Sequence, residues 1–267
     1  MSVIIQSGFV GINEPLDHPR IGWRAITGDA IGTNPRAGFS RENALDPRTA
    51  IAWSPTGAAP AQIGVDAGES VTASYCGVAG HDLGTQNASV SVQRWTGSSW
   101  TNIIGSQLIN RDDAILFLFA PVDASRFRLN ISSADNPVRI GHVRFGMVTE
   151  IPRRSGYGGT TPISEGRRYD YDALRTNNGA FLGRSIVSTS LQFQVSVQHV
   201  SETWRASEWV PFREHANRGD ATFFAADRPI DYPEDVAYAW SNEPVRAERG
   251  IANAAASIDF VLNCEAL

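Results

Sequence analysis

The sequence predicts an all-β protein made of two consecutive domains. The first is expected to be a β-sandwich, and the second a β-sandwich or barrel with one short helical segment. The chain has 267 residues, enough for two ordinary domains. Strand-like runs of alternating apolar and polar residues recur along it, separated by Gly, Pro, Asn and Ser. Residues 221–240 hold aromatics and prolines without a His, Cys or Ser cluster, which is typical of a packing surface and not of a reaction centre.

The composition places the chain among globular proteins. It is 42% hydrophobic and 19% charged, with a net charge of −5. All of its basic residues are arginines. One explanation for the missing lysine is a biased, GC-rich coding sequence. The alternative is that the planar guanidinium of arginine suits fixed interface contacts. A mildly acidic chain without a basic stripe argues against a nucleic-acid groove.

Two cysteines, Cys76 and Cys264, lie far apart in strand-like runs. This spacing is neither a disulfide framework nor a metal motif, so we expect buried free thiols, no metal and no cofactor. No apolar run approaches about 18 residues, so no membrane span is expected. The first residues lack the charged region and long apolar region of a signal peptide, and we expect synthesis in a cytoplasm.

Residues 1–60 are rich in X-Pro breakers and predict loops, with Trp23, Phe39 and Trp53 as anchors. After Pro60 the pattern changes to short strands with turns between them, and Ala67 and Gly68 are expected to end the first strand. The expected strands are 61–66, 70–78, 88–95, 100–103, 114–120, 126–131 and 138–146. About seven such strands make one sandwich, which we assign to residues 1–148.

Residues 149–162 predict a linker, because the composition shifts to Pro, Gly and the pair Arg153 and Arg154. The Gly-rich piece lacks the Gly-Lys-Ser/Thr ending of a phosphate loop. The second domain is then expected over residues 163–267.

Residues 185–200 predict a long strand that buries Leu191, Phe193, Val195 and Val197. Its other face is polar and uncharged, which suits a surface covered by a neighbouring subunit. The candidate oligomer interface is therefore formed by Gln192, Gln194, Ser196 and Gln198.

A helical segment follows this strand. Ser201 is the expected N-cap, Pro211 is expected to split the segment into two turns, and Gly219 to end it. A final strand is expected over residues 256–264.

The first half carries residues 43–46 and 51–53 (NALD and IAW) and ends on the strands 127–131 and 138–145 (FRLNI and VRIGHVRF). With these residues it resembles galactose-binding-like (discoidin-type) domains, which implies a jelly-roll β-sandwich. The cysteine pair that often joins the ends of such domains is absent. The resemblance implies binding of glycans, lipids or proteins through loops at one end. By position, the resemblance implies that the candidate ligand contacts are Trp23, Arg24, Asp46, Trp53 and His81.

Each candidate has a structural alternative. Trp53 fits a core anchor better than a sugar platform, because buried tryptophan is common in sandwiches. Asp46 precedes a proline and fits a turn former. His81 with Asp82 fits a turn between strands. For Trp23 and Arg24, an exposed contact pair and a structural role are equally open.

The second half is similar to the distal tail and tail-tip proteins of long-tailed phages. The similarity rests on residues 209–215, 223–229 and 235–240 (WVPFREH, FFAADRP and DVAYAW) and on the order of strands and helix. It implies a tail-tube-like domain that forms a trimeric or hexameric ring and contacts the tail tube protein and the tail hub or tape-measure protein.

No nucleophile elbow and no zinc-protease motif occurs, and the five histidines are scattered. We therefore expect no enzyme. The predicted function is a structural ring at the phage tail tip, located in the virion, with an outward domain that contacts a host surface glycan or a neighbouring tail protein. The alternative is a carbohydrate-binding module or adhesin that works as a monomer.

Overall fold

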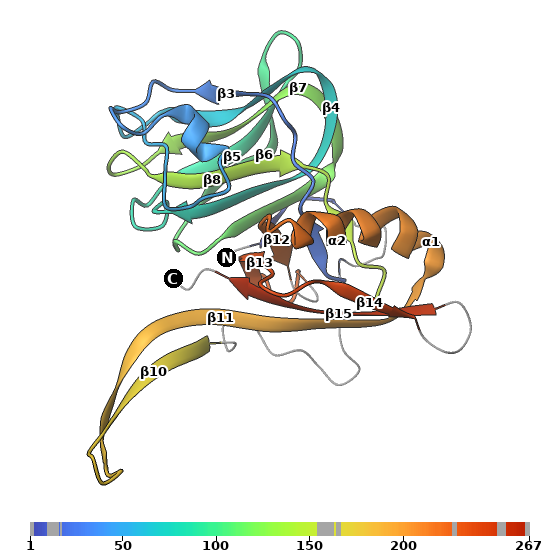
Figure 1. The fold of residues 1–267 in the computed structure, drawn as a ribbon. Helices are drawn as coiled ribbons and strands as arrows, with labels where there is room; N and C mark the ends of the chain where they lie inside the picture. Colours follow the sequence, from blue (N-terminus) through green and yellow to red (C-terminus); the bar gives the residue numbers. More distant parts are fainter. Residues whose placement is uncertain are drawn as a thin grey trace.

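The computed structural model describes residues 3–9, 16, 18–153, 163, 167–225, 229–249 and 255–264. Within these residues the chain forms two β-sheets and one helical segment, which confirms the all-β prediction. Figure 1 shows a β-sandwich stacked on a second, sheet-based half. Among the described residues, no helix is long and apolar enough to cross a membrane.

The first sheet makes the sandwich, and its strands are connected in the order β3-β4-β7-β5-β6, with β1 beside β7 and β8 beside β4. Its members are β1 (Val3–Ile5), β3 (Asp29–Gly32), β4 (Ala61–His81), β5 (Ser89–Trp95), β6 (Trp100–Leu108), β7 (Ile115–Ser133) and β8 (Ile140–Gly146). A short 3-10 helix, Arg41–Ala44, lies between β3 and β4.

Two long strands close this sheet over itself. The first part of β4 pairs with β3, and its last part pairs with β8. The register of β4 against β7 shifts between Asp66 and Val71, where Gly68 adopts a φ of 75°. The predicted strand end at Ala67 and Gly68 is therefore wrong: the chain bends there and stays paired with β7, because glycine permits this backbone conformation. Residues 115–120 and 126–131, expected as parts of two strands, likewise belong to the single strand β7.

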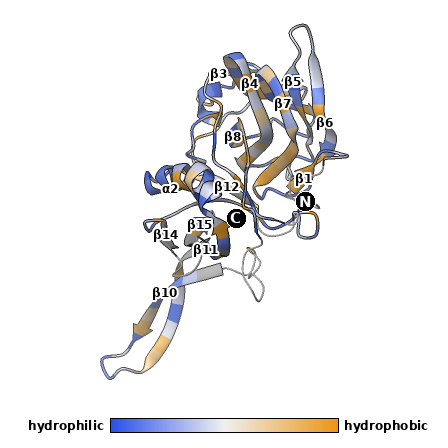
Figure 2. Ribbon diagram, turned by 90° about the vertical axis from the view of Figure 1, so that its right-hand side faces the viewer, coloured by the Kyte–Doolittle hydropathy of each residue, from blue (hydrophilic) through white to orange (hydrophobic). Residues whose placement is uncertain are grey.

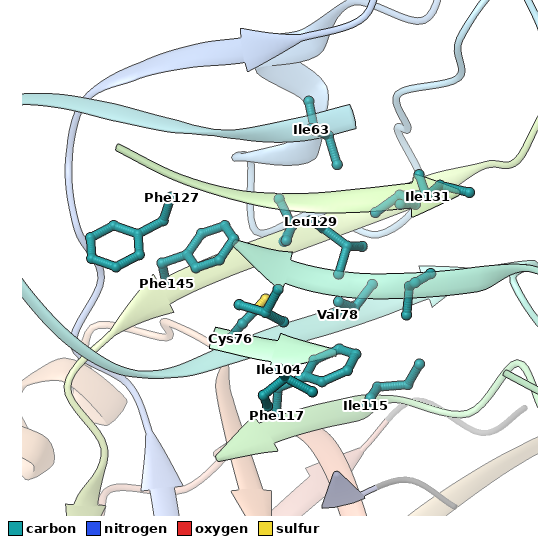
Figure 3. Close-up of a cluster of buried hydrophobic side chains, with 14 of the residues drawn as sticks. Ile63, Cys76, Val78, Ile104, Ile115, Phe117, Phe127, Leu129, Ile131 and Phe145 are labelled. Atoms are coloured by element: carbon teal, nitrogen blue, oxygen red, sulfur yellow. The ribbon is translucent and has the colours of Figure 1, made fainter. Parts of the chain in front are cut away.

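The alternating residues of these strands fill the space between the layers. Figure 3 shows this core, in which Phe127 stacks on Phe145 with ring centroids 5.9 Å apart. Cys76 is buried here as a free thiol, as expected. Burial raises the pKa of the Cys76 thiol well above its usual value, which keeps it protonated.

The second sheet has the order β10-β11-β15-β13-β12-β2-β9, with β14 beside β15. Its members are β2 (Arg20–Gly22), β9 (Thr149–Glu150), β10 (Arg167–Arg175), β11 (Phe181–Ser201), β12 (Thr222–Ala225), β13 (Val236–Trp240), β14 (Arg246–Arg249) and β15 (Ala255–Cys264). In sequence, β2 lies between β1 and β3 of the sandwich, and β9 lies in the expected linker. The expected first domain thus contributes one strand to the second sheet, and the expected linker contributes another.

The helical segment runs without a break through α1 (Glu202–Trp204), the π-helical turn Arg205–Trp209 and α2 (Val210–Asn217). Ser201 caps it, since its hydroxyl accepts a hydrogen bond from the Trp204 amide, as predicted. Pro211 does not split the segment. Proline has no backbone N–H, so a regular helix would lose one hydrogen-bond donor at Pro211. The wider π-helical turn Arg205–Trp209 lies at this place, immediately before α2.

Strands β12 and β13, which lie in the stretch 221–240, pack against the sandwich. The composition predicted a packing surface here but not that it joins the two halves. Strand β13 alternates between two cores: Val236 and Tyr238 pack toward the sandwich, whereas Ala237 and Ala239 pack toward the helical segment. Phe223 of β12 lies beside Tyr238 with ring centroids 4.8 Å apart. The strand is therefore buried on both faces, which explains its continuous apolar run.

Strands β10 and β11 extend beyond the rest of the molecule as a hairpin (Figure 1), and in Figure 2 apolar patches lie along this hairpin. We call residues 169–187 of it the arm. Strand β11 pairs with β10 over residues 181–191 and with β15 over residues 191–201, so it links the arm to the second sheet.

Candidate functional site

The predicted ligand contacts Trp23 and Arg24 serve to attach the segment after β2 to the helical segment. The Trp23 indole donates to Thr149 Oγ1 at 3.0 Å and packs against Phe212. Arg24 pairs with Glu208 at 2.9 Å and lies over the Trp23 ring. Of the two interpretations left open for this pair, the structure favours the structural one.

Asp46 has the geometry of a turn former. Its carboxylate accepts bonds from the backbone amide and the guanidinium of Arg48, at distances of 2.7 to 2.9 Å. The hydrogen bond from the Arg48 side chain lowers the pKa of Asp46 to about 2, so the turn is charged and intact at neutral pH.

Trp53 and His81 are core residues. Trp53 has no exposed surface and bridges Ile140 through its backbone. His81 is 6% exposed, and its Nδ1 accepts a bond from the Leu83 amide at 3.3 Å. Burial lowers the pKa of His81 to about 4, so it is neutral at pH 7. Neither side chain has the surface that a sugar platform needs.

The five candidates also lie at two ends of the sandwich. His81 pairs with Ile140, where β8 begins. Arg24 lies at the other end of β8, because its carbonyl accepts from the Tyr75 hydroxyl and Tyr75 pairs with Gly146. They therefore do not form one site.

The loop that follows Asp46 faces the second half of the protein. A cleft of about 360 Å³ lies between them, and the Tyr238 hydroxyl crosses to the Pro47 carbonyl at 2.8 Å. It is lined by residues 47–50, 219–221, Tyr238 and Trp240. Strand β13 thus partly covers the end of the sandwich whose loops would bind a ligand according to the resemblance.

The predicted oligomer face is only partly exposed. Gln194 is exposed, Gln192 and Ser196 are half-buried, and the side chain of Gln198 lies outside the described residues. On the opposite face Val195 and Val197 are buried, as the alternation predicted. This stretch of β11 pairs with β15 along one edge, whereas the printed pairing with β10 ends at Leu191.

The arm is a surface that sequence reasoning missed. Most of the large hydrophobic side chains that the described residues leave exposed belong to it: Tyr169, Tyr171, Leu174, Phe181, Leu182, Ile186 and Val187. Two neighbouring pairs, Phe181 with Leu182 and Ile186 with Val187, interrupt the alternation of a half-buried strand. That interruption is the sequence signal, because consecutive strand residues point to opposite faces.

A second missed surface is the outer face of the sandwich over β4, β7, β5 and β6. It carries two partly exposed tryptophans, Trp95 and Trp100, whose rings meet edge to face at 5.4 Å. Arg128 lies over the Trp100 ring at 4.0 Å. Among the described residues no group of three potential metal ligands occurs.

Comparison with known proteins gives structural likenesses alone. No protein-family model matches the sequence, and no curated protein matches it. Similar solved structures include SpGH29, at 18% identity over 47% of this chain and 28% of that one, with a TM-score of 0.39.

Two smaller proteins match over nearly their whole length. A pectin-binding carbohydrate-binding module is 13% identical over 46% of this chain and 91% of its own, with a TM-score of 0.40. Chitosan-binding module 1 from a Paenibacillus sp. IK-5 chitosanase/glucanase is 17% identical over 48% and 99%, with a TM-score of 0.40. All three likenesses leave more than half of this chain unmatched, and they do not identify what it binds.

Proposed function

We propose that this chain is a structural subunit that assembles with copies of itself through the arm, and that the assembly is the ring of a phage tail tip. The observation that carries self-assembly is the apolar arm. Phe181, Leu182 and Val187 are between 66% and 70% exposed, on a hairpin that leaves the body. Contiguous exposed apolar surface on a folded protein marks a surface that a partner covers.

The arm carries apolar side chains on both of its faces. Tyr171 and Ile186 pair directly across the hairpin and share one face, whereas Leu174, three residues after Tyr171 in β10, lies on the other face. Tyr169 and Tyr171 stack at 6.0 Å, and Arg184 covers Tyr171 at 4.1 Å. A partner on one side would leave the other face in water. Insertion between two neighbouring subunits covers both faces, and such head-to-tail contacts close into rings.

The tail-tip placement rests on the resemblance of residues 160–267 to distal tail proteins. In this proposal the partners are the tail tube protein and the tail hub or tape-measure protein. The protein is made in the host cytoplasm and resides in the virion. We propose no catalytic role.

Self-assembly is tested by light scattering over a range of protein concentrations. The wild-type protein is expected to form a defined oligomer, and the double variant Phe181→Ser, Val187→Ser a monomer. The matched control is Leu108→Ser, since Leu108 is 67% exposed but lies on β6 of the sandwich. A monomeric wild-type protein at all concentrations overturns the proposal, and so does an arm variant that keeps the wild-type mass.

The tail-tip placement needs a separate test. Antibodies against the chain, used for gold labelling of intact virions of the phage that encodes it, should label the end of the tail. Labelling of the capsid, or none, contradicts the placement and leaves self-assembly to be judged on the mass measurement.

The second candidate function is carbohydrate binding by the sandwich, which a monomer can perform. The observation that favours it is the pair of partly exposed tryptophans on the outer face of the sandwich. Aromatic rings at a protein surface offer a flat apolar platform beside polar groups, which suits the mixed surface of a sugar.

A further inference from the structure

We propose that the outer face of the sandwich around Arg128 is a binding site for an oligosaccharide that carries carboxylate groups. This inference deepens the second candidate function and does not depend on self-assembly. The site lies on the sheet surface, away from the loops that hold Asp46 and His81.

A row of planar polar side chains crosses four adjacent strands at this face. The Arg128 Nε donates to Gln93 Oε1 at 2.7 Å, and its Nη1 donates to Gln62 Oε1 at 2.7 Å. The Gln93 amide in turn donates to Asn102 Oδ1 at 2.8 Å. Since adjacent strands lie about 4.8 Å apart, the row spans roughly 14 Å, which suits an oligosaccharide better than a single sugar.

Gly64 helps to hold Arg128 flat on the sheet. It pairs directly with Arg128 in the adjacent strand, and an added Cβ would lie 2.8 Å from the Arg128 Cβ. Without a side chain at this position, the guanidinium extends between Gln62 and Gln93. The fixed orientation lowers the entropy that Arg128 loses when it binds a ligand.

The charge of Arg128 is not balanced at this face. Among the described residues no carboxylate pairs with it, whereas its neighbour Arg126 pairs with Asp66 at 2.6 Å. Its two bonds to glutamine oxygens use two of five guanidinium donors, so N–H groups remain for a ligand. A carboxylate is the group that best matches a planar guanidinium.

The tryptophans supply the apolar part of the site. Trp100 is partly exposed, and the Arg128 guanidinium lies 4.0 Å from the centroid of its ring. Trp95 contacts Trp100 edge to face. The C–H face of a sugar ring can pack on such an indole while its carboxylate meets Arg128. Other neighbours of Arg128 on this face bear amide and hydroxyl groups, as in the bond from Asn130 to Ser91 at 3.2 Å. The surface around Arg128 is therefore more polar than the arm, which exposes Phe181, Leu182, Ile186 and Val187.

The test is calorimetric titration of the full chain with tetragalacturonate and with its fully methyl-esterified form, which keeps the sugar rings and removes the charge. A second matched pair is sialyllactose and lactose. We expect an acidic member to bind and its uncharged match to bind at least about tenfold more weakly, since the ester or the missing sugar removes a charge-assisted bond. Absence of binding by both acidic members at millimolar concentration overturns the proposal, as does equal binding of acid and ester.

Variants locate the site. Arg128→Gln and Trp100→Ala should each weaken binding at least about tenfold, and Arg128→Lys should fall between Arg128→Gln and wild type because it keeps the charge but loses the fork. The matched control is Arg36→Gln, because Arg36 also stacks on a ring, that of Phe39 at 4.5 Å, elsewhere on the sandwich. Unchanged binding by Arg128→Gln, or an equal loss in Arg36→Gln, contradicts the site.

One outcome would show that a second copy of the chain, and not a sugar, covers this face. If Trp100→Ala lowers the mass measured by light scattering, the face is a subunit contact and the glycan site is overturned. If the arm variant loses the oligomer but still binds the sugar, self-assembly and sugar binding use different surfaces, as the two proposals state.

Discussion

At the scale of single residues, Gly77 marks the place where the sandwich meets the second sheet. It lies in β4, and an added Cβ would lie 2.4 Å from the ring of Phe223 in β12. Phe223 is fully buried, so its ring has little room to move. We expect Gly77→Ala to lower the free energy of unfolding by about 1–3 kcal/mol through overpacking, measured by urea denaturation.

Gly105→Ala is the control for that experiment. Gly105 lies in β6, and an added Cβ there would meet no atom within 4 Å. The change should be neutral or slightly stabilising, because alanine restricts the unfolded chain. An equal loss of stability in both variants would show that the effect of Gly77→Ala comes from the strand itself and not from contact with Phe223.

His142 couples the stability of the same interface to pH. It is 2% exposed and stacks on Phe223 with ring centroids 6.0 Å apart. Burial, and then the charge of Arg144, lower the pKa of His142 to about 3. Below the unfolded pKa of about 6.5, the unfolded chain binds a proton that the native protein excludes. Stability from this group is therefore complete above that pH and is lost progressively as the pH falls toward about 3.

The wild-type protein should lose roughly 1–2 kcal/mol of unfolding free energy through His142 between about pH 7 and pH 5. His142→Phe keeps a stacked ring and removes the titration, so urea denaturation at both values should show a smaller difference between them. His199→Asn is the control, because His199 is exposed and asparagine tolerates its φ of 59°. A pH difference that is identical in wild type and His142→Phe would show that this histidine is not the source.

At the scale of elements, alternation predicted most strands but not their connections. The buried Val195 and Val197 of β11 follow from the pattern, because a strand with one covered face alternates. The continuity of β4 across Gly68 does not, since glycine ends a strand in one context and bends it in another. Strand β2 lacks any pattern of its own, and its position depends on pairing with β12, far along the chain.

The candidate sites show the same limit. A tryptophan can serve in a core or as a sugar platform, and the structure buries Trp53 while it leaves Trp95 and Trp100 partly exposed. Whether an indole meets solvent depends on which face of which sheet it occupies. The sequence of the arm contains a local signal, consecutive apolar residues such as Phe181 and Leu182. That these residues are exposed follows only from the projection of the hairpin away from the rest of the molecule.

At the scale of the whole molecule, described residues of the two halves share one hydrophobic core. That core combines Tyr75 and Leu118 of the sandwich with Phe223 and Tyr238 of the second sheet. Hydrogen bonds also cross between the halves: Arg144 donates to the Ala221 carbonyl at 2.8 Å. In addition, β2 and β9, which flank β3 to β8 in the sequence, extend the second sheet.

This shared core predicts that the body unfolds as one unit. Far-ultraviolet circular dichroism and tryptophan fluorescence should give coincident urea transitions, because neither half can unfold without exposing apolar surface of the other. A fragment of residues 1–148 should be markedly less stable than the full chain, since it exposes Tyr75, Leu116 and Leu118, which are buried in the intact protein. Two separate transitions, or a fragment as stable as the full chain, would mean that the sandwich is an independent domain and that the shared core contributes little to it.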